Sequence, residues 1–215
     1  MNKIIKFILV LMIVGITGLA QSPEVITTAD GKGADASLYN DADKGPNTNA
    51  GSRGYIEIRN HNLRARIGYL KFDLSDSSLE PQNAIIGLKS QTSDNIAQDT
   101  MHFTIYGMTE DSLDNWQEGE VNYNNAPGFD DAPLGDFVIN DNLSELTQIE
   151  VYKDSNGVFL YTDSSSTMDD FIKNDGNDIV TFAIVQTLEN NGGLYLFDSK
   201  EVSLEAAPQL ILQTE

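Results

Sequence analysis

Basic side chains gather in one short stretch of an otherwise acidic chain. The sequence has 13 Lys and Arg residues against 33 Asp and Glu residues, which gives a formal net charge of −20. Residues 53–74 nevertheless carry four arginines and one lysine, with Glu57 as the only acid before Asp73. Arginine presents a planar fork of N–H donors that binds a carboxylate through two hydrogen bonds. The stretch is therefore a candidate site for a ligand with repeated negative charges.

Eight side chains of this stretch are candidate ligand contacts, because they are cationic, aromatic or, for histidine, able to gain a proton near neutral pH. They are Arg53, Tyr55, Arg59, His61, Arg64, Arg66, Tyr69 and Lys71. A polymer with one carboxylate per repeating unit needs cations at intervals to bind it, and a flat ring can pack on an apolar face of such a unit. Neighbouring strands lie about 4.8 Å apart, and same-face side chains lie about 6.6 Å apart along a strand, which suits such a grid.

Two alternating segments surround these side chains and predict two β-strands joined by a loop. In residues 55–59 and 67–73, apolar side chains alternate with polar or aromatic ones, as in strands that turn one face to a core. The inward positions are Ile56, Ile58, Leu70 and Phe72. Arg64 and Arg66 share the parity of Leu70, so we expect a β-bulge at Gly68 to turn them outward.

The rest of the chain repeats this pattern, and helical periodicity is almost absent. Short alternating or apolar runs, separated by Asp, Asn, Gly and Ser clusters, predict strands at residues 34–39, 55–59, 67–72, 83–91, 102–108, 135–139, 147–152, 158–161, 179–186, 194–199 and 209–213. One short helix is expected near residues 167–174, with Ser166 as its cap and Gly176 after its end. The fold class is therefore all-β, a jelly-roll-type β-sandwich with one short helix. Its core is expected to include also Phe182, Ile184, Leu210 and Leu212.

The N-terminal residues have the pattern of a secretory signal peptide. Lys3 and Lys6 precede an apolar run at residues 7–16, and Gly18 and Ala20 stand at the positions of a cleavage site. We therefore expect residues 1–20 to be removed and residues 21–215 to form a single domain of a secreted or periplasmic protein. The chain has no cysteine, so no disulfide stabilises it. Its acidity argues against nucleic acid as a partner, and we expect a monomer without membrane insertion after cleavage.

Two places in the sequence are candidates for a structural calcium ion, although no cofactor is required. Residues 40–51 are rich in Asp, Asn and Gly, and they offer oxygen ligands from Asp41, Asp43, Asn47 and Asn49. The alternative is that these side chains bind their own backbone in turns. The second candidate is the pair Asp35 and Asp198, near the first and last strands, which approach each other if the end strands of the sandwich pair.

Catalytic chemistry has little support in the sequence. Only two histidines are present, and there is no HExxH motif, Gly-rich phosphate loop or GxSxG elbow. His61 with Arg64, Arg66 and Tyr69 could imitate a polysaccharide lyase, in which a cation neutralises the uronate and a His or Tyr acts as base. A loop histidine among arginines more often extends a binding surface, so we do not expect an enzyme.

Three segments of the sequence resemble one family. They are RIGYLKFDLSD at residues 66–76, IYGMTEDSLDNWQEGEVNYNNAP at residues 105–127, and GLYLFDSKE followed by APQLIL within residues 193–212. Together they resemble DNRLRE-type β-sandwich domains, which include the alginate-binding carbohydrate-binding modules of family 96. The alginate-binding members carry lysines and arginines on the same early pair of strands, whereas this chain has mostly arginine there.

The second of these segments contains Trp116, and Tyr123 takes the place of the family's usual second tryptophan. We expect both rings to pack a long loop against the sandwich, because aromatic residues with a polar group commonly fasten loops. The alternative is that Trp116 stacks on a sugar ring.

These observations leave three functional hypotheses. The first is a secreted, non-catalytic carbohydrate-binding protein for an anionic polysaccharide, with alginate or another polyuronate as the ligand that the resemblance implies. The second is a structural or adhesive surface module without a glycan ligand, and the third is a small polysaccharide lyase. Surface ion pairs contribute only about 0–1 kcal/mol each, so pairing with surface acids does not account for cations that cluster where acids are missing. The first hypothesis is therefore favoured.

Overall fold

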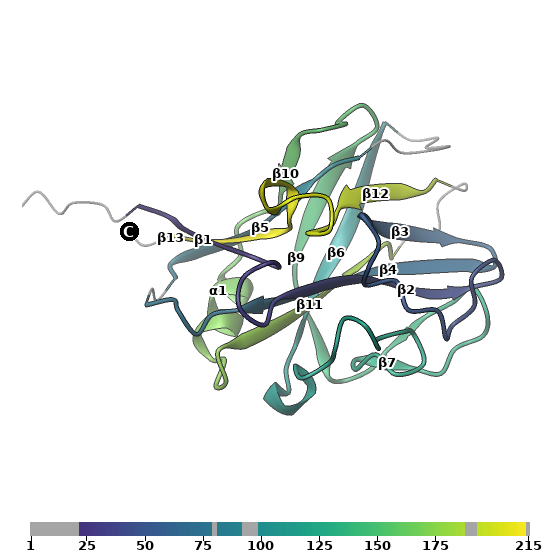
Figure 1. The fold of residues 1–215 in the computed structure, drawn as a ribbon, viewed down its shortest axis with the longest axis horizontal. Coiled ribbons are helices and arrows are strands. Elements are labelled where there is room, and N and C mark those ends of the chain that lie inside the picture. Colours follow the sequence, from purple (N-terminus) through teal and green to yellow (C-terminus); the bar gives the residue numbers. More distant parts are fainter. Residues whose placement is uncertain (1–21, 79–80, 92–98, 188–192, 214–215) are drawn as a thin grey trace, which may run out of the picture.

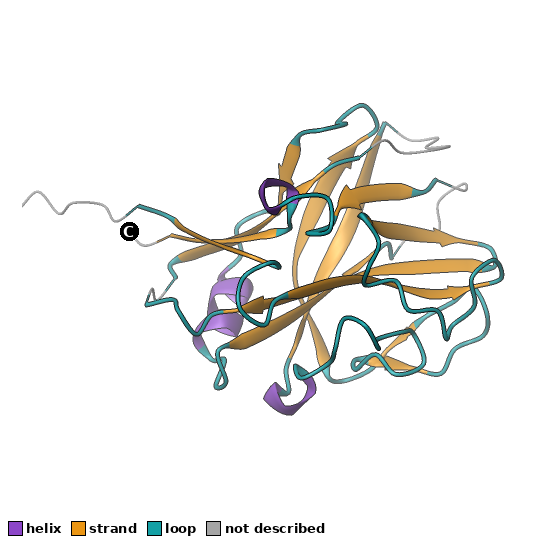
Figure 2. Ribbon diagram, viewed as in Figure 1, coloured by secondary structure: helices purple, strands orange, loops and turns teal. Residues whose placement is uncertain are grey.

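The computed structural model describes residues 22–78, 81–91, 99–187 and 193–213, which form a two-layer β-sandwich (Figure 1, Figure 2). Strands account for 46% of the structure and the sheets are antiparallel, which confirms the prediction of an all-β sandwich with one short helix. No described helix is long and apolar enough to cross a membrane. The predicted signal peptide at residues 1–20 lies outside the described residues.

The larger layer is a seven-stranded sheet in the order β12-β3-β4-β11-β6-β9, with β2 paired to β4. Its strands are β2 (Ala34–Asp41), β3 (Tyr55–His61), β4 (Arg64–Asp73), β6 (Thr100–Met108), β9 (Leu143–Tyr152), β11 (Ile179–Val185) and β12 (Tyr195–Asp198). β4 is the centre of this sheet, because it pairs with β2 along one edge and with β11 and β3 along the other.

The smaller layer is a four-stranded sheet in the order β1-β13-β5-β10. Its strands are β1 (Glu24–Thr27), β5 (Asn83–Lys89), β10 (Phe159–Tyr161) and β13 (Gln209–Gln213). Isolated bridges join Ser90 to Phe197 and Ile149 to Thr162. Because Phe197 lies on β12 and Ile149 on β9, both end strands of the larger sheet are linked by backbone pairing to the smaller one.

The main core lies between the two layers, and it contains every side chain predicted for it. These are Ile56, Ile58, Leu70, Phe72, Phe182, Ile184, Leu210 and Leu212, all fully or almost fully buried. Strand alternation accounts for the agreement, because the inward positions of both sheets are apolar. The rings of Phe72 and Phe182 meet edge to face, with 5.8 Å between their centroids.

Helix α1 (Ser166–Lys173) covers one end of this core, close to the predicted position. Asp169 in its first turn accepts a hydrogen bond from the backbone N–H of Ala84 at 2.7 Å, which ties the helix to β5. The predicted cap is wrong, because Ser165 is the N-cap residue and makes no side-chain cap hydrogen bond. Its hydroxyl instead donates to the carbonyl of Leu146 at 2.7 Å and ties the helix to β9.

A long connection, residues 109–142, covers the other face of the larger sheet and builds a second core there. It contains three short elements: the 3-10 helix η1 (Asp111–Leu113), β7 (Phe129–Asp130) and β8 (Val138–Ile139). Trp116 and Tyr123 are buried in this second core, which confirms that they pack the connection against the sandwich. The indole N–H of Trp116 donates to the hydroxyl of Thr181 at 3.0 Å.

Some strand boundaries differ from the sequence prediction. β1 and β7 are absent from the prediction, because four and two residues are too few for an alternation to stand out. The strand expected at residues 135–139 is reduced to β8, since Gly135 has a φ of +92° and its N–H donates to the carbonyl of Asn40 at 2.8 Å. β4 begins at Arg64 because it forms a hairpin with β3. A second 3-10 helix, η2 (Leu204–Ala206), precedes β13.

Candidate functional site

The turn end of the β3–β4 hairpin holds four of the eight predicted ligand contacts. Arg59 lies opposite Arg66 across the two strands, and His61 lies opposite Arg64. Asn62 in the turn has a φ of +48°, a left-handed conformation that asparagine tolerates better than most residues. The hairpin therefore brings three arginines and the histidine to the same end of the larger sheet.

The bulge predicted at Gly68 is absent, which corrects the expected route of the arginines to the surface. β2 pairs with β4 through Gly68 without a register shift, and Ser37 lies opposite it. The glycine instead makes room for a core side chain, since a Cβ there would lie 3.0 Å from Cγ2 of Ile56. Arg64 and Arg66 therefore keep the parity of the inward positions of β4.

Arg66 is the centre of a buried ion-pair network. Its Nε lies 2.6 Å from Asp41 Oδ2, and its Nη1 lies 2.9 Å from Glu57 Oε2. Lys44 Nζ lies 2.6 Å from the same Glu57 carboxylate. The Arg66 side chain is only 6% exposed. The network therefore joins β2, β3, β4 and the loop after β2 from the inside, and Arg66 is not a surface contact.

An aromatic ring packs against this network. Tyr39 is fully buried, and Lys44 Nζ lies 4.3 Å from the centroid of its ring. The Arg53 guanidinium lies 5.4 Å from the same centroid and donates to the Tyr55 hydroxyl at 3.2 Å. Burial, together with the charge of Glu57, raises the pKa of Tyr39, so the ring stays neutral and its face attracts the cations.

Arg64 and Arg59 lie on the side of the Arg66 ion-pair network that faces solvent. The Arg64 side chain contacts both carboxylate oxygens of Asp43, at 2.6 and 3.2 Å, and is 36% exposed. This hydrogen bonding lowers the pKa of Asp43. Arg59 is half-buried, and its burial, followed by the charges of Arg66 and Arg64, lowers its pKa. Three guanidinium groups thus lie close together on this side, beside the carboxylates of Asp41 and Asp43.

Five cations thus meet around the hairpin, and we call them the cationic edge: Lys44, Arg53, Arg59, Arg64 and Arg66. The carboxylates paired with them belong to Asp41, Asp43 and Glu57. Positive side chains are therefore concentrated here within the described part of the chain, whereas acids dominate the sequence as a whole. The sequence prediction missed Lys44. Its position as the single cation within residues 40–51 is the signal that could have identified it.

Tyr69 and Lys71 are buried beneath the long connection, which corrects the expectation that they lie on an open face. The Tyr69 hydroxyl donates to the carbonyl of Pro127 at 2.9 Å. Lys71 Nζ donates to the carbonyl of Trp116 at 2.6 Å and lies 4.6 Å from the Trp116 ring. Strand alternation does place both side chains opposite the main core, but residues 109–142 cover that face.

The four residues that could imitate a lyase are not brought together. Tyr69 lies in the second core, on the face of β4 opposite to the parity of Arg64 and Arg66. The guanidinium of Arg66 is already bound by the two buried carboxylates. His61 therefore has neither the tyrosine nor an open Arg66 beside it for the predicted chemistry.

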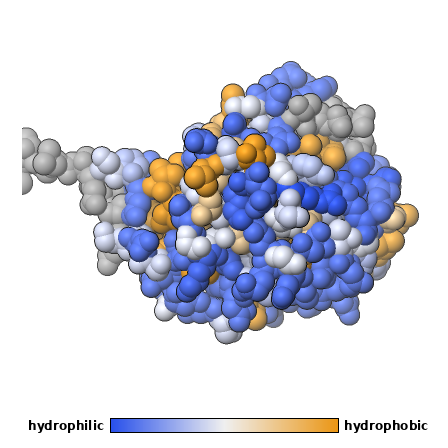
Figure 3. Space-filling model, viewed as in Figure 1, coloured by the Kyte–Doolittle hydropathy of each residue, from blue (hydrophilic) through white to orange (hydrophobic). Residues whose placement is uncertain are grey.

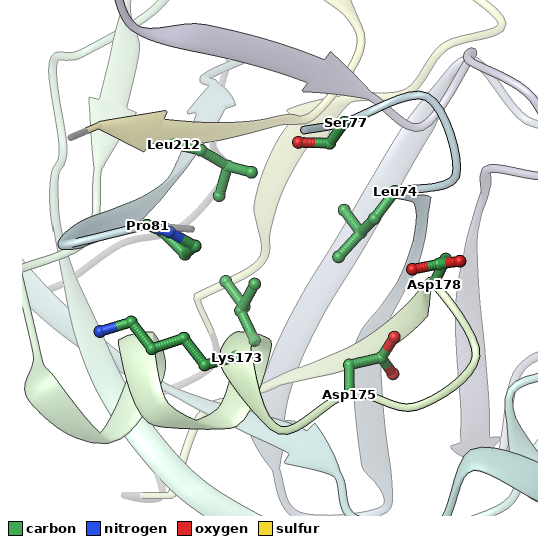
Figure 4. A pocket seen from close by; sticks show the side chains of 8 residues that line it. Leu74, Ser77, Pro81, Lys173, Asp175, Asp178 and Leu212 are labelled. Carbon is green, nitrogen blue, oxygen red and sulfur yellow. The ribbon is translucent and has the colours of Figure 1, made fainter. Parts of the chain in front are cut away.

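Two pockets lie away from the cationic edge. One, of about 430 Å³, is lined by Lys32, Lys71, Asp111, Asp114, Asn115, Gln117, Asn177 and Ile179. The other, of about 380 Å³, lies between the end of α1 and β13 (Figure 4). Its lining is Leu74, Ser77, Pro81, Ile172, Lys173, Asp175, Asp178 and Leu212. Lys71 is the only predicted ligand contact that lines either of these pockets.

Asp114, in the first pocket, gives a testable pH dependence. Burial raises its pKa to about 7, and the charges of Asp175 and Asp111 act in the same direction, against Lys71. A carboxyl with a raised folded-state pKa contributes stability fully below its unfolded pKa and loses it as pH rises through the folded pKa. The free energy of unfolding of Asp114→Asn is therefore expected to equal that of the wild type near pH 4 and to exceed it by about 1–4 kcal/mol near pH 8.

Chemical denaturation across this pH range measures the effect. Asp131→Asn is the matched control, because Asp131 is exposed on the same connection. The control is expected to show no pH-dependent gain over the wild type. An Asp114→Asn variant that is no more stable than the wild type at pH 8 would contradict the burial of a charged carboxylate.

The two carboxylates expected at a calcium ion have protein partners. Asp35 Oδ2 accepts a hydrogen bond from the Thr28 hydroxyl at 2.6 Å, and burial raises the pKa of Asp35 to about 6. Asp198 accepts a hydrogen bond from Gln91 and lies 3.6 Å from Lys89 Nζ. Within the described ranges, no group of three or more His, Cys, Asp or Glu side chains is arranged to hold a metal. These contacts do not favour calcium, which stays a prediction of the sequence.

The polar loop after β2 also uses its side chains within the protein. Asp41 Oδ1 accepts hydrogen bonds from the backbone N–H groups of Asp43 and Lys44, at 2.9 and 2.7 Å. Asn49 donates to the carbonyl of Val121 at 2.8 Å and so fastens the long connection. The turn alternative therefore describes Asp41.

The described structure is thus a β-sandwich domain whose larger sheet carries the cationic edge at one end. The chain belongs to carbohydrate-binding module family 96, whose sequence profile matches residues 33–214. This match includes the larger sheet, the long connection and the strands of the smaller sheet except β1. A comparison with curated proteins found no match.

Proposed function

We propose that this module binds an anionic polysaccharide of the polyuronate class, with alginate as the first candidate, and that it does so without catalysis. The observation that carries the proposal is the cationic edge on a chain whose formal net charge is −20. An anionic polymer is attracted to this edge and repelled by the acidic remainder of the surface. Membership of a carbohydrate-binding family supports a sugar ligand, and the charge supports its acidic character.

Arg59 and Arg64 are the side chains that we expect to bind the polymer carboxylates. Both reach solvent, and Arg64 has its guanidinium beside the exposed carboxylate of Asp43, which a ligand carboxylate can displace. Arg53 precedes β3 and Tyr55 is its first residue, and both side chains are half-buried. The tyrosine ring offers a surface to a sugar face. The proposed contacts are thus Arg53, Tyr55, Arg59, His61 and Arg64, while Lys44 and Arg66 hold the hairpin from within.

The separation of His61 and Arg64 from Tyr69, described above, supports binding without catalysis as part of this proposal. Export to the periplasm or the medium is also part of the proposal, because residues 1–20 have the pattern of a signal peptide. We further propose that the module acts as a monomer along the polymer.

The double variant Arg59→Ala/Arg64→Ala tests this function. We expect each lost arginine to weaken alginate binding by about 1–3 kcal/mol, the range for hydrogen bonds to charged groups. Affinity electrophoresis in gels that contain alginate, pectin or a neutral glucan measures the retention, and thermal melting verifies that the variant is folded. The control Lys153→Ala/Lys173→Ala removes the same charge outside the cationic edge. It is expected to leave alginate retention nearly unchanged.

Unchanged retention of the arginine double variant would overturn the proposal and favour a structural or adhesive module. One observation supports that second hypothesis, because Arg64 and Arg66 already bind carboxylates of the protein itself. Rising salt is expected to weaken alginate retention of the wild type, since exposed charges are screened within about 10 Å at 0.1 M ionic strength. Ultraviolet absorbance from unsaturated products of alginate would instead reveal a lyase.

A further inference from the structure

The outer face of the four-stranded sheet differs in composition from the rest of the surface. Its outward positions are Val25, Thr27, Asn83, Ile85, Gly87, Lys89, Phe159, Tyr161, Gln209, Ile211 and Gln213. The side chains that alternate with them, such as Ile86, Leu160 and Leu210, lie in the main core and fix this parity. None of the outward positions is acidic, in a chain with 33 acidic residues. We call this surface the aromatic face, after its two rings.

Phe159 and Tyr161 lie on this face as a near-parallel pair. Their ring centroids are 6.2 Å apart, and the planes are inclined by 22°. Tyr161 is 48% exposed, whereas Leu160 between the two rings is buried in the core. Ring pairs of the main core cross at larger angles, from 49° to 84°. The pair on β10 adds apolar aromatic surface to the outer side of the smaller sheet.

Gly87 leaves room for the Tyr161 ring beside β5. The two residues are opposite each other on β5 and β10. A Cβ at Gly87 would lie 2.8 Å from Cε1 and 3.1 Å from Cδ1 of Tyr161, and 3.5 Å from Oε1 of Gln209. One edge of the ring thus occupies the space that a side chain at position 87 would fill, and the Gln209 amide lies next to it. A side chain at position 87 would displace the ring.

A row of apolar side chains lies on the same face as the rings. Val25 lies opposite Ile211, and Ile211 lies opposite Ile85, across three neighbouring strands. Figure 3 shows hydrophobic surface gathered over β1, β13 and β5. Polar amides and Lys89 border this row, and Lys89 Nζ lies 3.6 Å from Asp198. An exposed apolar patch with a polar rim is typical of a binding surface.

We propose that the aromatic face is a second glycan-binding surface, which takes the apolar faces of uncharged pyranose rings. The C–H face of a pyranose is flat and packs on an aromatic ring, while its hydroxyls hydrogen-bond to amides at the border. A face with no carboxylate, whose single lysine is already near an acid, offers nothing that selects a charged sugar. The cationic edge and the aromatic face therefore differ in the charge of the ligand, and this inference does not depend on polyuronate binding.

The test uses hydroxyethylcellulose, a soluble neutral glucan, in affinity gels at high salt, where electrostatic attraction is screened. The wild type is expected to be retarded, and Tyr161→Ala is expected to bind about five- to tenfold more weakly, as the loss of an aromatic stacking contact predicts. Tyr152→Ala is the matched control, because Tyr152 is 47% exposed and lies on β9, outside the aromatic face. Gln209→Ala tests the amide at the border. Arg59→Ala/Arg64→Ala is expected to keep the full retardation in this gel.

Three outcomes would overturn the inference. The wild type could pass the neutral gel without retardation, or Tyr152→Ala could weaken binding as much as Tyr161→Ala. Light scattering could also show that Tyr161→Ala changes the oligomeric state without changing glycan binding, in which case the face is a contact between copies of the chain. Loss of alginate retention in the arginine variant, with neutral-glucan retention intact, separates this surface from the cationic edge.

Discussion

Replacing Phe72 by alanine is expected to cost about 3–5 kcal/mol of unfolding free energy. Phe72 is fully buried in the main core, and its ring meets that of Phe182 with 5.8 Å between centroids. It lies on β4, the strand that holds β2, β3 and β11 together. The chain has no cysteine, so no disulfide offsets the cavity. Urea denaturation with a two-state analysis measures the loss.

The same substitution at the surface is the control for Phe72→Ala. Phe159 is half-buried on the outer face of the smaller sheet, so Phe159→Ala leaves no closed cavity and is expected to cost about 1 kcal/mol or less. A loss below about 1 kcal/mol for Phe72→Ala itself would show that the ring is not tightly enclosed. That result would contradict the inward parity on which the whole description of β4 depends.

The main core could be predicted from the sequence because alternation is a local property. Ile56, Leu70 and Phe182 each belong to a short run in which every second residue is apolar and faces the core. This alternation can be recognised without knowledge of distant residues. The same alternation placed Tyr69 and Lys71 on the opposite face. It carried no information on what covers that face, because residues 109–142 fold over it through contacts with distant strands.

The grouping of the cations could also be predicted, but their partners could not. Asp41 and Asp43 are more than twenty positions away from Arg64 and Arg66 in the sequence, and they come beside the arginines only through the pairing of β2 with β4. In the sequence alone, these acids stand in a polar loop with two alternatives, calcium ligands or hydrogen bonds to the backbone of a turn. A charge pattern shows which groups attract a ligand, whereas the pairing register decides which of them remain exposed.

The aromatic face could be predicted from the sequence only in part. Phe159 and Tyr161 stand two positions apart in a predicted strand, so they must share one face of it. The pattern does not show which face is outward, because Phe159 and Leu160 are both apolar. Only the pairing with Gly87 shows where the Tyr161 ring finds space beside β5.

Replacing Arg66 by alanine is the second large effect that we expect, about 3–5 kcal/mol of unfolding free energy. The substitution leaves the buried carboxylates of Asp41 and Glu57 without the guanidinium that lies 2.6 and 2.9 Å from them. Arg64→Ala is the matched control, because it makes the same change two residues away on a side chain that is 36% exposed. The control is expected to cost no more than about 1 kcal/mol. Urea denaturation of both variants measures the difference.

The charge balance of the network provides a second check and decides how Arg66 can be used in binding experiments. The triple variant Arg66→Met/Asp41→Asn/Glu57→Gln removes the cation together with both acids, and it is expected to recover much of the stability, since neutral replacements of buried ion pairs are often tolerated. A triple variant as unstable as Arg66→Ala would show that Arg66 acts through packing instead. In either case Arg66 holds the fold, so weaker alginate retention by Arg66→Ala would report loss of the hairpin. The role of the cationic edge in binding is therefore decided by Arg59 and Arg64, which reach solvent.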